Sequence, residues 1–181
     1  MDRSKVFSHT VAFGLVSLFA LVTPVGGQEC LYQVNVPDWP NWDQRLSNVA
    51  VADGYAYTTY CRTDTGEGAL RAVDVRTPSE PVDMGELEMC LGELVVSGRY
   101  VYADRPYLSP YVGDMGVQVI DVSDPRSPTD VTLIRGAGRI GAISGEYAFT
   151  FSSEGMWVID ISNPTSPTEV GFLATGSYHI L

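Results

Sequence analysis

Three aspartates stand inside hydrophobic runs of this sequence, and their carboxylates are the groups best suited to chemistry. Asp74, Asp121 and Asp160 each precede a turn that contains two prolines. A ring of carboxylates at a channel mouth would bind Ca²⁺, but calcium requires six to eight oxygens from a tight cluster. We therefore expect each aspartate to accept hydrogen bonds from the backbone of the turn that follows it. We predict no cofactor, with a calcium site as the alternative.

Histidine, the usual general base, is nearly missing from the chain. The two histidines are His9, which lies just before an N-terminal apolar run, and His179, which lies near the other end. A Ser-His-Asp or Cys-His arrangement therefore finds almost no support. We predict that the protein is not an enzyme. The alternative is an exported hydrolase or lyase with an acidic or calcium-assisted site.

The charge balance excludes one class of partner. The sequence has 22 acidic and 11 basic residues, which gives a formal net charge of −11. Nucleic acids and anionic membranes bind proteins that present a basic surface. We therefore predict no nucleic-acid partner and no binding to an anionic membrane surface.

The N-terminus has the pattern of a secretory signal peptide. Arg3 and Lys5 precede the apolar run Val11–Val22, and small residues follow it. A membrane-spanning helix needs about 20 apolar residues, and this run is shorter. We predict a signal peptide at residues 1–27, a secreted or cell-surface protein, and no membrane span after cleavage. Residues 28–44 then form an N-terminal extension.

Three cysteines remain after this segment, and their number is odd. They are Cys30, Cys61 and Cys90. Export permits a disulfide, but an odd count allows only one internal bridge. We expect the bridge between Cys61 and Cys90, which lie in one repeat and at its junction with the next.

An internal repeat is the main signal in the sequence. The segments LRAVDVRTPSEP, VQVIDVSDPRSP and MWVIDISNPTSP align around the three aspartates. A second block carries Tyr55, Tyr100 and Tyr147, and the step from Asp74 to Tyr100 equals the step from Asp121 to Tyr147. The repeats span about 45–91, 92–137 and 138–176, and a fourth begins at 177.

Each repeat contains four strand-sized segments separated by turns. In the third repeat they are Ile140–Ile143, Tyr147–Phe151, Met156–Ile161 and Glu169–Leu173. Four antiparallel strands in each repeat of this length are typical of a β-propeller blade. The predicted fold class is therefore all-β, with three complete four-stranded antiparallel blades of a partial propeller.

One strand indicates how the blades pack. In VQVIDVS, one face carries Val117, Val119 and Asp121, and the other carries Ile120 and Val122. A sheet with one face in water would alternate apolar and polar residues. We therefore expect this blade to lie between two others.

These segments resemble a known repeat family. VQVIDVSDP and MWVIDISNP are similar to the LVIVD repeat, and LRAVDVRTP is a weaker copy. The resemblance covers about Arg45–Leu181. It implies a β-propeller, export and a binding or scaffolding role, and it implies no catalytic residues.

The connection between the second and third strands is longer in the first two repeats. In the second repeat it holds Arg105, Tyr107, Tyr111 and Asp114. Connections at one position of every repeat emerge on one face, which is often the binding face. Tyrosine and arginine are also enriched in interfaces. We predict that these four residues bind a protein or surface ligand, and a longer solvated loop is the alternative.

The last repeat is incomplete. The same step, taken from Asp160, places the next tyrosine beyond Leu181. Propellers have typically four to eight blades, and an open array exposes its end faces. We expect either a fragment of a larger surface protein, without a ligand of its own, or self-association through the open blade ends.

Overall fold

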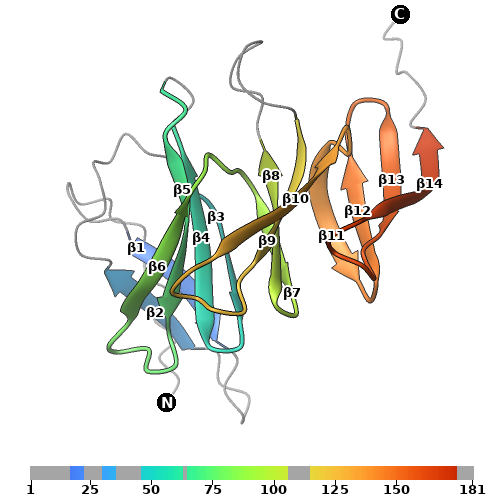
Figure 1. The fold of residues 1–181 in the computed structure, drawn as a ribbon. Coiled ribbons are helices and arrows are strands. Elements are labelled where there is room, and N and C mark those ends of the chain that lie inside the picture. The colour runs from blue at the N-terminus through green and yellow to red at the C-terminus, as the bar shows by residue number, and fades with distance from the viewer. Residues whose placement is uncertain (1–16, 23–29, 36–45, 63–64, 106–114, 175–181) are drawn as a thin grey trace, which may run out of the picture.

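The structure, a computed structural model, describes residues 17–22, 30–35, 46–62, 65–105 and 115–174 (Figure 1). Every regular element in this part of the chain is a β-strand. The described residues therefore contain no helix that could cross a membrane.

Twelve of the strands form three four-stranded antiparallel sheets, which we call blades 1, 2 and 3. In each blade the four strands pair in sequence order. Blade 1 contains β3 (Leu46–Ala52), β4 (Tyr55–Cys61), β5 (Gly68–Asp74) and β6 (Val82–Glu88). Blade 2 contains β7 (Leu94–Ser97), β8 (Tyr100–Arg105), β9 (Gly116–Asp121) and β10 (Thr129–Arg135). Blade 3 contains β11 (Arg139–Ser144), β12 (Tyr147–Phe151), β13 (Gly155–Asp160) and β14 (Thr168–Ala174).

The predicted all-β class with three four-stranded blades is confirmed. The four strands predicted in the third repeat correspond to β11–β14, and each of their ends differs by one residue or less. The reason is local: Val, Ile, Tyr, Phe and Thr fill the strands, and Gly, Asn, Asp and Pro separate them.

A separate pair of strands precedes the blades. β1 (Ser17–Val22) and β2 (Cys30–Asn35) are antiparallel, with Ser17 opposite Asn35. β1 lies in the predicted signal peptide and β2 in the predicted extension. The pairing does not test cleavage, so the signal peptide remains a prediction.

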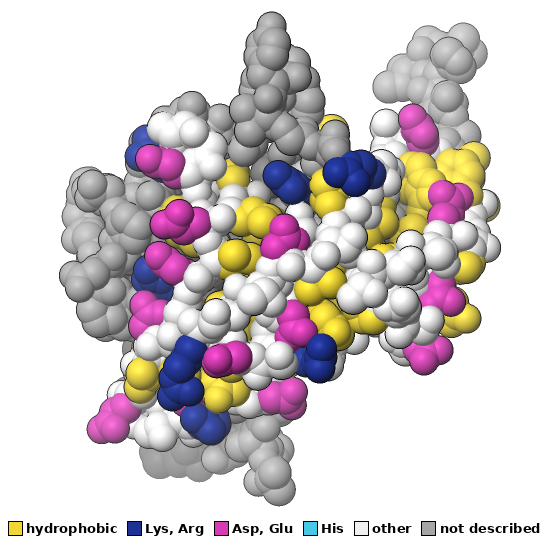
Figure 2. Space-filling model, in the orientation of Figure 1, with side chains coloured by type: hydrophobic (Ala, Val, Ile, Leu, Met, Phe, Trp, Pro, Cys, Tyr) yellow, Lys and Arg dark blue, Asp and Glu magenta, His cyan; other side chains and the backbone are white. Residues whose placement is uncertain are grey.

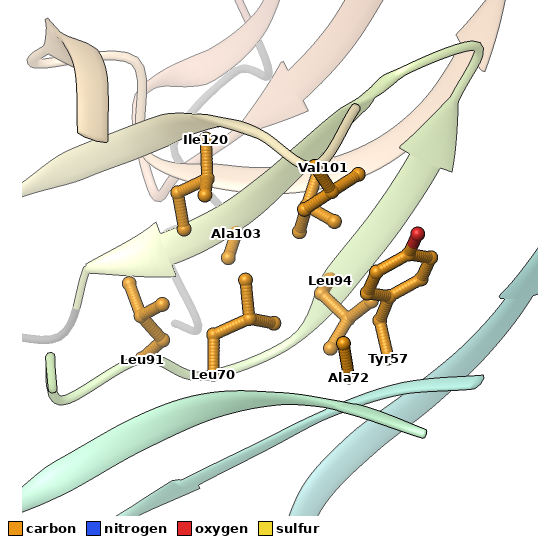
Figure 3. Close-up of a cluster of buried hydrophobic side chains, with 9 residues drawn as sticks. Tyr57, Leu70, Ala72, Leu91, Leu94, Val101, Ala103 and Ile120 are labelled. Atoms are coloured by element: carbon orange, nitrogen blue, oxygen red, sulfur yellow. The ribbon is translucent and has the colours of Figure 1, made fainter. Parts of the chain in front are cut away.

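The blades lie side by side, with blade 2 between the others (Figure 1). β7, the first strand of blade 2, contacts both β3 and β11, the first strands of the other two blades. The first strand is therefore the innermost of each sheet. Tyr57, Leu70 and Ala72 of blade 1 pack against blade 2, as Figure 3 shows. The second blade contributes Leu94, Val101, Ala103, Ile120 and Val122 to this cluster, together with Leu91 just before β7.

A second cluster joins blades 2 and 3. Tyr102, Val117 and Val119 of blade 2 pack with Ala148 and other buried residues of blade 3. β9 therefore directs Val117 and Val119 toward blade 3 and Ile120 and Val122 toward blade 1. The prediction that both faces of this strand are covered is confirmed.

A glycine permits the closest approach between blades 1 and 2. Gly85 of β6 lies against the backbone of Arg126, in the proline turn of blade 2, and an added Cβ would overlap the Arg126 carbonyl oxygen. Gly171 occupies the equivalent position in blade 3, where an added Cβ would meet only the Val158 side chain at 3.6 Å.

We expect Gly85→Ala to lower the free energy of unfolding by about 1–3 kcal/mol, the usual cost of overpacking. Urea unfolding followed by circular dichroism measures it. Gly171→Ala is the matched control and should be nearly neutral. Equal effects of the two substitutions would contradict the packing described.

Candidate binding surfaces

The repeated aspartates all bind the turn that follows them. A carboxylate oxygen of Asp121 accepts the backbone N–H of Ser123 at 2.8 Å, and Asp160 accepts that of Ser162 at 2.8 Å. Asp74 accepts the N–H of residue 76 at 3.0 Å. Each aspartate thus fixes the end of its third strand to the proline turn.

Each aspartate also lies directly opposite the repeated tyrosine of its blade. The pairs are Tyr55 with Asp74, Tyr100 with Asp121, and Tyr147 with Asp160.

An arginine joins the two members of the pair in blades 1 and 2. Arg76 pairs with Asp74 and lies 5.3 Å from the Tyr55 ring centre. Arg99 pairs with Asp121 at 2.9 Å and lies 5.1 Å from the ring centre of the opposite tyrosine. Blade 3 has Ser162 and Glu146 at these two places, and Tyr147 is 43% exposed.

The hydrogen bonds keep these carboxylates ionised. Bonds from Arg76 lower the pKa of Asp74 to about 2. Bonds from Ser162 lower the pKa of Asp160. Burial opposes ionisation of Asp121, but bonds from Ser123 and Arg99 outweigh it and lower the pKa. Within the described ranges, no three His, Cys, Asp or Glu side chains gather as metal ligands.

The predicted binding residues lie where β8 ends. Arg105 is the last residue of β8, and its guanidinium donates to the Gln118 side-chain oxygen at 3.2 Å. Gln118 is buried and donates in turn to Asp130 and to the Thr132 carbonyl oxygen. Arg105 is therefore anchored within blade 2.

Tyr107, Tyr111 and Asp114 lie outside the described residues. The proposed binding role of these residues and Arg105 therefore remains a prediction.

A disulfide secures the same end of blade 1. Cys61, at the end of β4, is bonded to Cys90, and their Cα atoms are 4.6 Å apart. Gly68 pairs opposite Cys61, and an added Cβ there would run into the Cys90 backbone. The bridge therefore ties the β4–β5 connection to the segment that enters blade 2.

In blades 1 and 2, the residue four positions after the repeated tyrosine makes a polar contact with the next blade. In blade 1, Thr59 donates from its hydroxyl to the Gly92 carbonyl oxygen at 2.6 Å, just before β7. In blade 2, Asp104 accepts the backbone N–H of Ile140 in β11 at 2.6 Å. Phe151 occupies the equivalent position of blade 3 and is 45% exposed.

A groove of about 540 Å³ lies between blades 2 and 3. Thr132, Trp157, Thr165 and Glu169 are among the side chains that line it. Thr132 stands where blade 1 has Gly85, and it lines this groove together with the proline turn of blade 3. Hydroxyl and carboxylate groups therefore lie beside an indole ring in this groove.

The outer face of blade 3 is apolar and uncovered. Phe151 and Leu173 both pair with Met156, so all three share one face of the sheet. Figure 2 shows hydrophobic side chains at the surface in the region of β13 and β14. On this face Tyr147 is 43% exposed, Phe151 is 45% exposed and Leu173 is 62% exposed. Phe172, which is 48% exposed, pairs with Trp157 on the opposite face.

The fold and the repeated aspartate turn define a repeat protein made of β-propeller-type blades. Comparison with known protein families matches the LVIVD repeat at residues 110–132 and 136–175, which include β9 and the whole of blade 3. These two segments of the chain are therefore similar to the LVIVD repeat. No curated protein matches it.

Sequence reasoning missed two features of these surfaces. Arg76 and Arg99 occupy different places in their repeats, so aligning the repeats did not bring them together. Asp104 also has no counterpart of the same type, since Thr59 and Phe151 replace it. The signal that could have revealed Asp104 is a carboxylate at an inward-facing position of a largely apolar strand.

We expect Asp74→Asn to unfold more easily than the wild type at pH 7. The folded-state pKa of Asp74 is about 2, below the ordinary 3.8, so its stabilisation is present above pH 4 and lost as the pH falls toward 2. Urea unfolding between pH 2 and 7 should therefore show the difference between the two proteins closing in acid. A difference that is constant over this range would refute the role of the ionised carboxylate.

We expect Cys61→Ser with Cys90→Ser to lower the free energy of unfolding by about 3–4 kcal/mol, from the 29-residue separation of the two cysteines. Thermal or urea unfolding measures this loss. Cys30→Ser is the control for removal of a thiol outside the bridge and should change stability little. A double variant as stable as the wild type would show that the bridge constrains nothing.

Proposed function

We propose that this chain is a non-enzymatic, exported repeat module that acts by binding and scaffolding. Its main contact surface is the outer face of blade 3, and the partner is another blade of the same kind, supplied by a second copy of the chain. The observation that carries the proposal is that this face repeats two faces already buried in the molecule.

The correspondence holds position by position. Val117 and Ile134 of blade 2 occupy the places of Met156 and Leu173, and both pack in the cluster with blade 3. Leu70 and Leu87 occupy the same places in blade 1 and pack in the cluster with blade 2.

Leu173 on this face is 62% exposed, the largest exposed fraction among the large hydrophobic side chains of the described residues. Contiguous apolar surface of this kind marks an interaction site on a soluble protein.

Export is supported by two independent features. The N-terminal segment has the pattern of a signal peptide, and a disulfide between Cys61 and Cys90 persists in oxidising compartments. The predicted loop site at Arg105, Tyr107, Tyr111 and Asp114 would give the module a second contact surface at one end of the blades.

We expect the wild type to associate reversibly, and Phe151→Glu with Leu173→Glu to be monomeric while keeping its β-sheet circular dichroism spectrum. Light scattering after gel filtration over a concentration series measures the mass. Val82→Glu is the matched control, because Val82 is 54% exposed on β6 of blade 1 and away from this face. A folded wild type that stays monomeric throughout would overturn self-association.

A further inference from the structure

A buried carboxylate lies between blades 2 and 3. Asp104 is 5% exposed, and one of its oxygens accepts the Ile140 N–H across the junction. Its other oxygen, Oδ2, is buried and has no hydrogen-bond partner among the described residues. The nearest cation is the Arg139 guanidinium, whose Nε lies 3.8 Å from Oδ2.

That arginine compensates the charge poorly. The Arg139 side chain is 67% exposed, so water screens its attraction for the carboxylate. The backbone on both sides is already engaged: Gly92 donates to the Asp104 carbonyl oxygen, and the Asp104 N–H donates to Glu93. An ionised Asp104 thus leaves one charged oxygen dehydrated, which favours the neutral form.

The charged groups that face this site come from each neighbouring element. Glu93, before β7, opposes ionisation, and Arg139 of β11 and the Ile140 N–H favour it. Arg105 follows on β8 but binds Gln118. Burial is the largest effect, and it raises the pKa of Asp104 to about 6 from the ordinary 3.8.

Of the two junctions between described blades, only this one has a carboxyl group at this strand position. Thr59 makes the corresponding contact between blades 1 and 2, and a hydroxyl does not titrate. Phe151, at the same place in blade 3, has a hydrocarbon side chain. The three blades are therefore alike in shape at this position and different in chemistry.

We propose that Asp104 is a pH-sensitive latch, which holds blade 3 against blade 2 more firmly when its carboxyl is protonated than when it is ionised. A proton on Oδ2 removes the dehydrated charge and leaves Oδ1 free to accept the Ile140 N–H. β8 ends one residue later, so the latch lies at the base of the β8–β9 connection.

The direction follows from linkage. The folded protein holds the proton of Asp104 up to about pH 6, and the opened junction releases it near pH 3.8. The latch is therefore fully closed below pH 4 and weakens as the pH rises through 6. Opening should become easier by up to about 100-fold, tenfold for each unit between the two values.

Hydrogen exchange of the Ile140 amide in the full chain tests this latch, after correction for the pH dependence of intrinsic exchange. We expect its protection to fall by about 10- to 100-fold between pH 4.5 and 7.5. In Asp104→Asn and in Asp104→Thr, which reproduces the blade 1 residue, protection should not change with pH. Amides of β7, which follows the Thr59–Gly92 contact, report a junction where the equivalent residue is a threonine.

Asp124→Asn is the matched control. The Asp124 carboxylate accepts the Arg126 N–H, and Asn163 accepts an N–H in the same way in blade 3, so this substitution should preserve the pH response. Titration of the Asp104 carboxyl carbon by NMR in the wild type is independent of any variant and should give a midpoint near 6. A midpoint near 4, or equal protection of Ile140 at both pH values, would overturn the latch.

Discussion

Each described blade of this protein carries apolar residues on both faces, so it gains stability in water where another sheet covers each face. Blade 2 satisfies this condition, since Val101 and Ile120 are covered by blade 1 and Val117 and Val119 by blade 3. A bulge interrupts the pairing of β9 with β10, and bulges bend and twist strands. β6 lies close to the proline turn of blade 2 at Gly85. Both features adjust one sheet to the next within this packing. Strand order, turn position and glycine placement all depend on it.

Departures from the repeat give the molecule its individual surfaces. Thr132 stands in place of glycine and lines a groove, Asp104 in place of threonine puts a carboxyl group at a junction, and Phe151 is exposed on the outer face of blade 3. None of these changes alters the four-stranded blade. The common pattern thus supplies the framework, and the exceptions supply contacts that differ from one end of the array to the other.

Local pattern was sufficient to predict the strands and the alternation of Val117 and Ile120, because both depend on residues close in sequence. The role of Gly85 and the orphan oxygen of Asp104 could not be predicted in this way. They depend on how far one sheet lies from the next, and strand periodicity carries no information about that distance. The tyrosines of the predicted binding loop, Tyr107 and Tyr111, lie outside the described residues, so that part of the site still rests on sequence alone.

Face-to-face packing of the blades determines their stability, and hydrogen exchange resolved by strand is the measurement that can show this. We expect β8 and β9, which are covered on both faces, to be the most protected of the described strands. β12 and β13 should exchange faster in a monomer and approach the protection of blade 2 when the outer face of blade 3 is covered. Faster exchange in β8 and β9 than in β12 and β13 would show that packing between the blades does not determine stability.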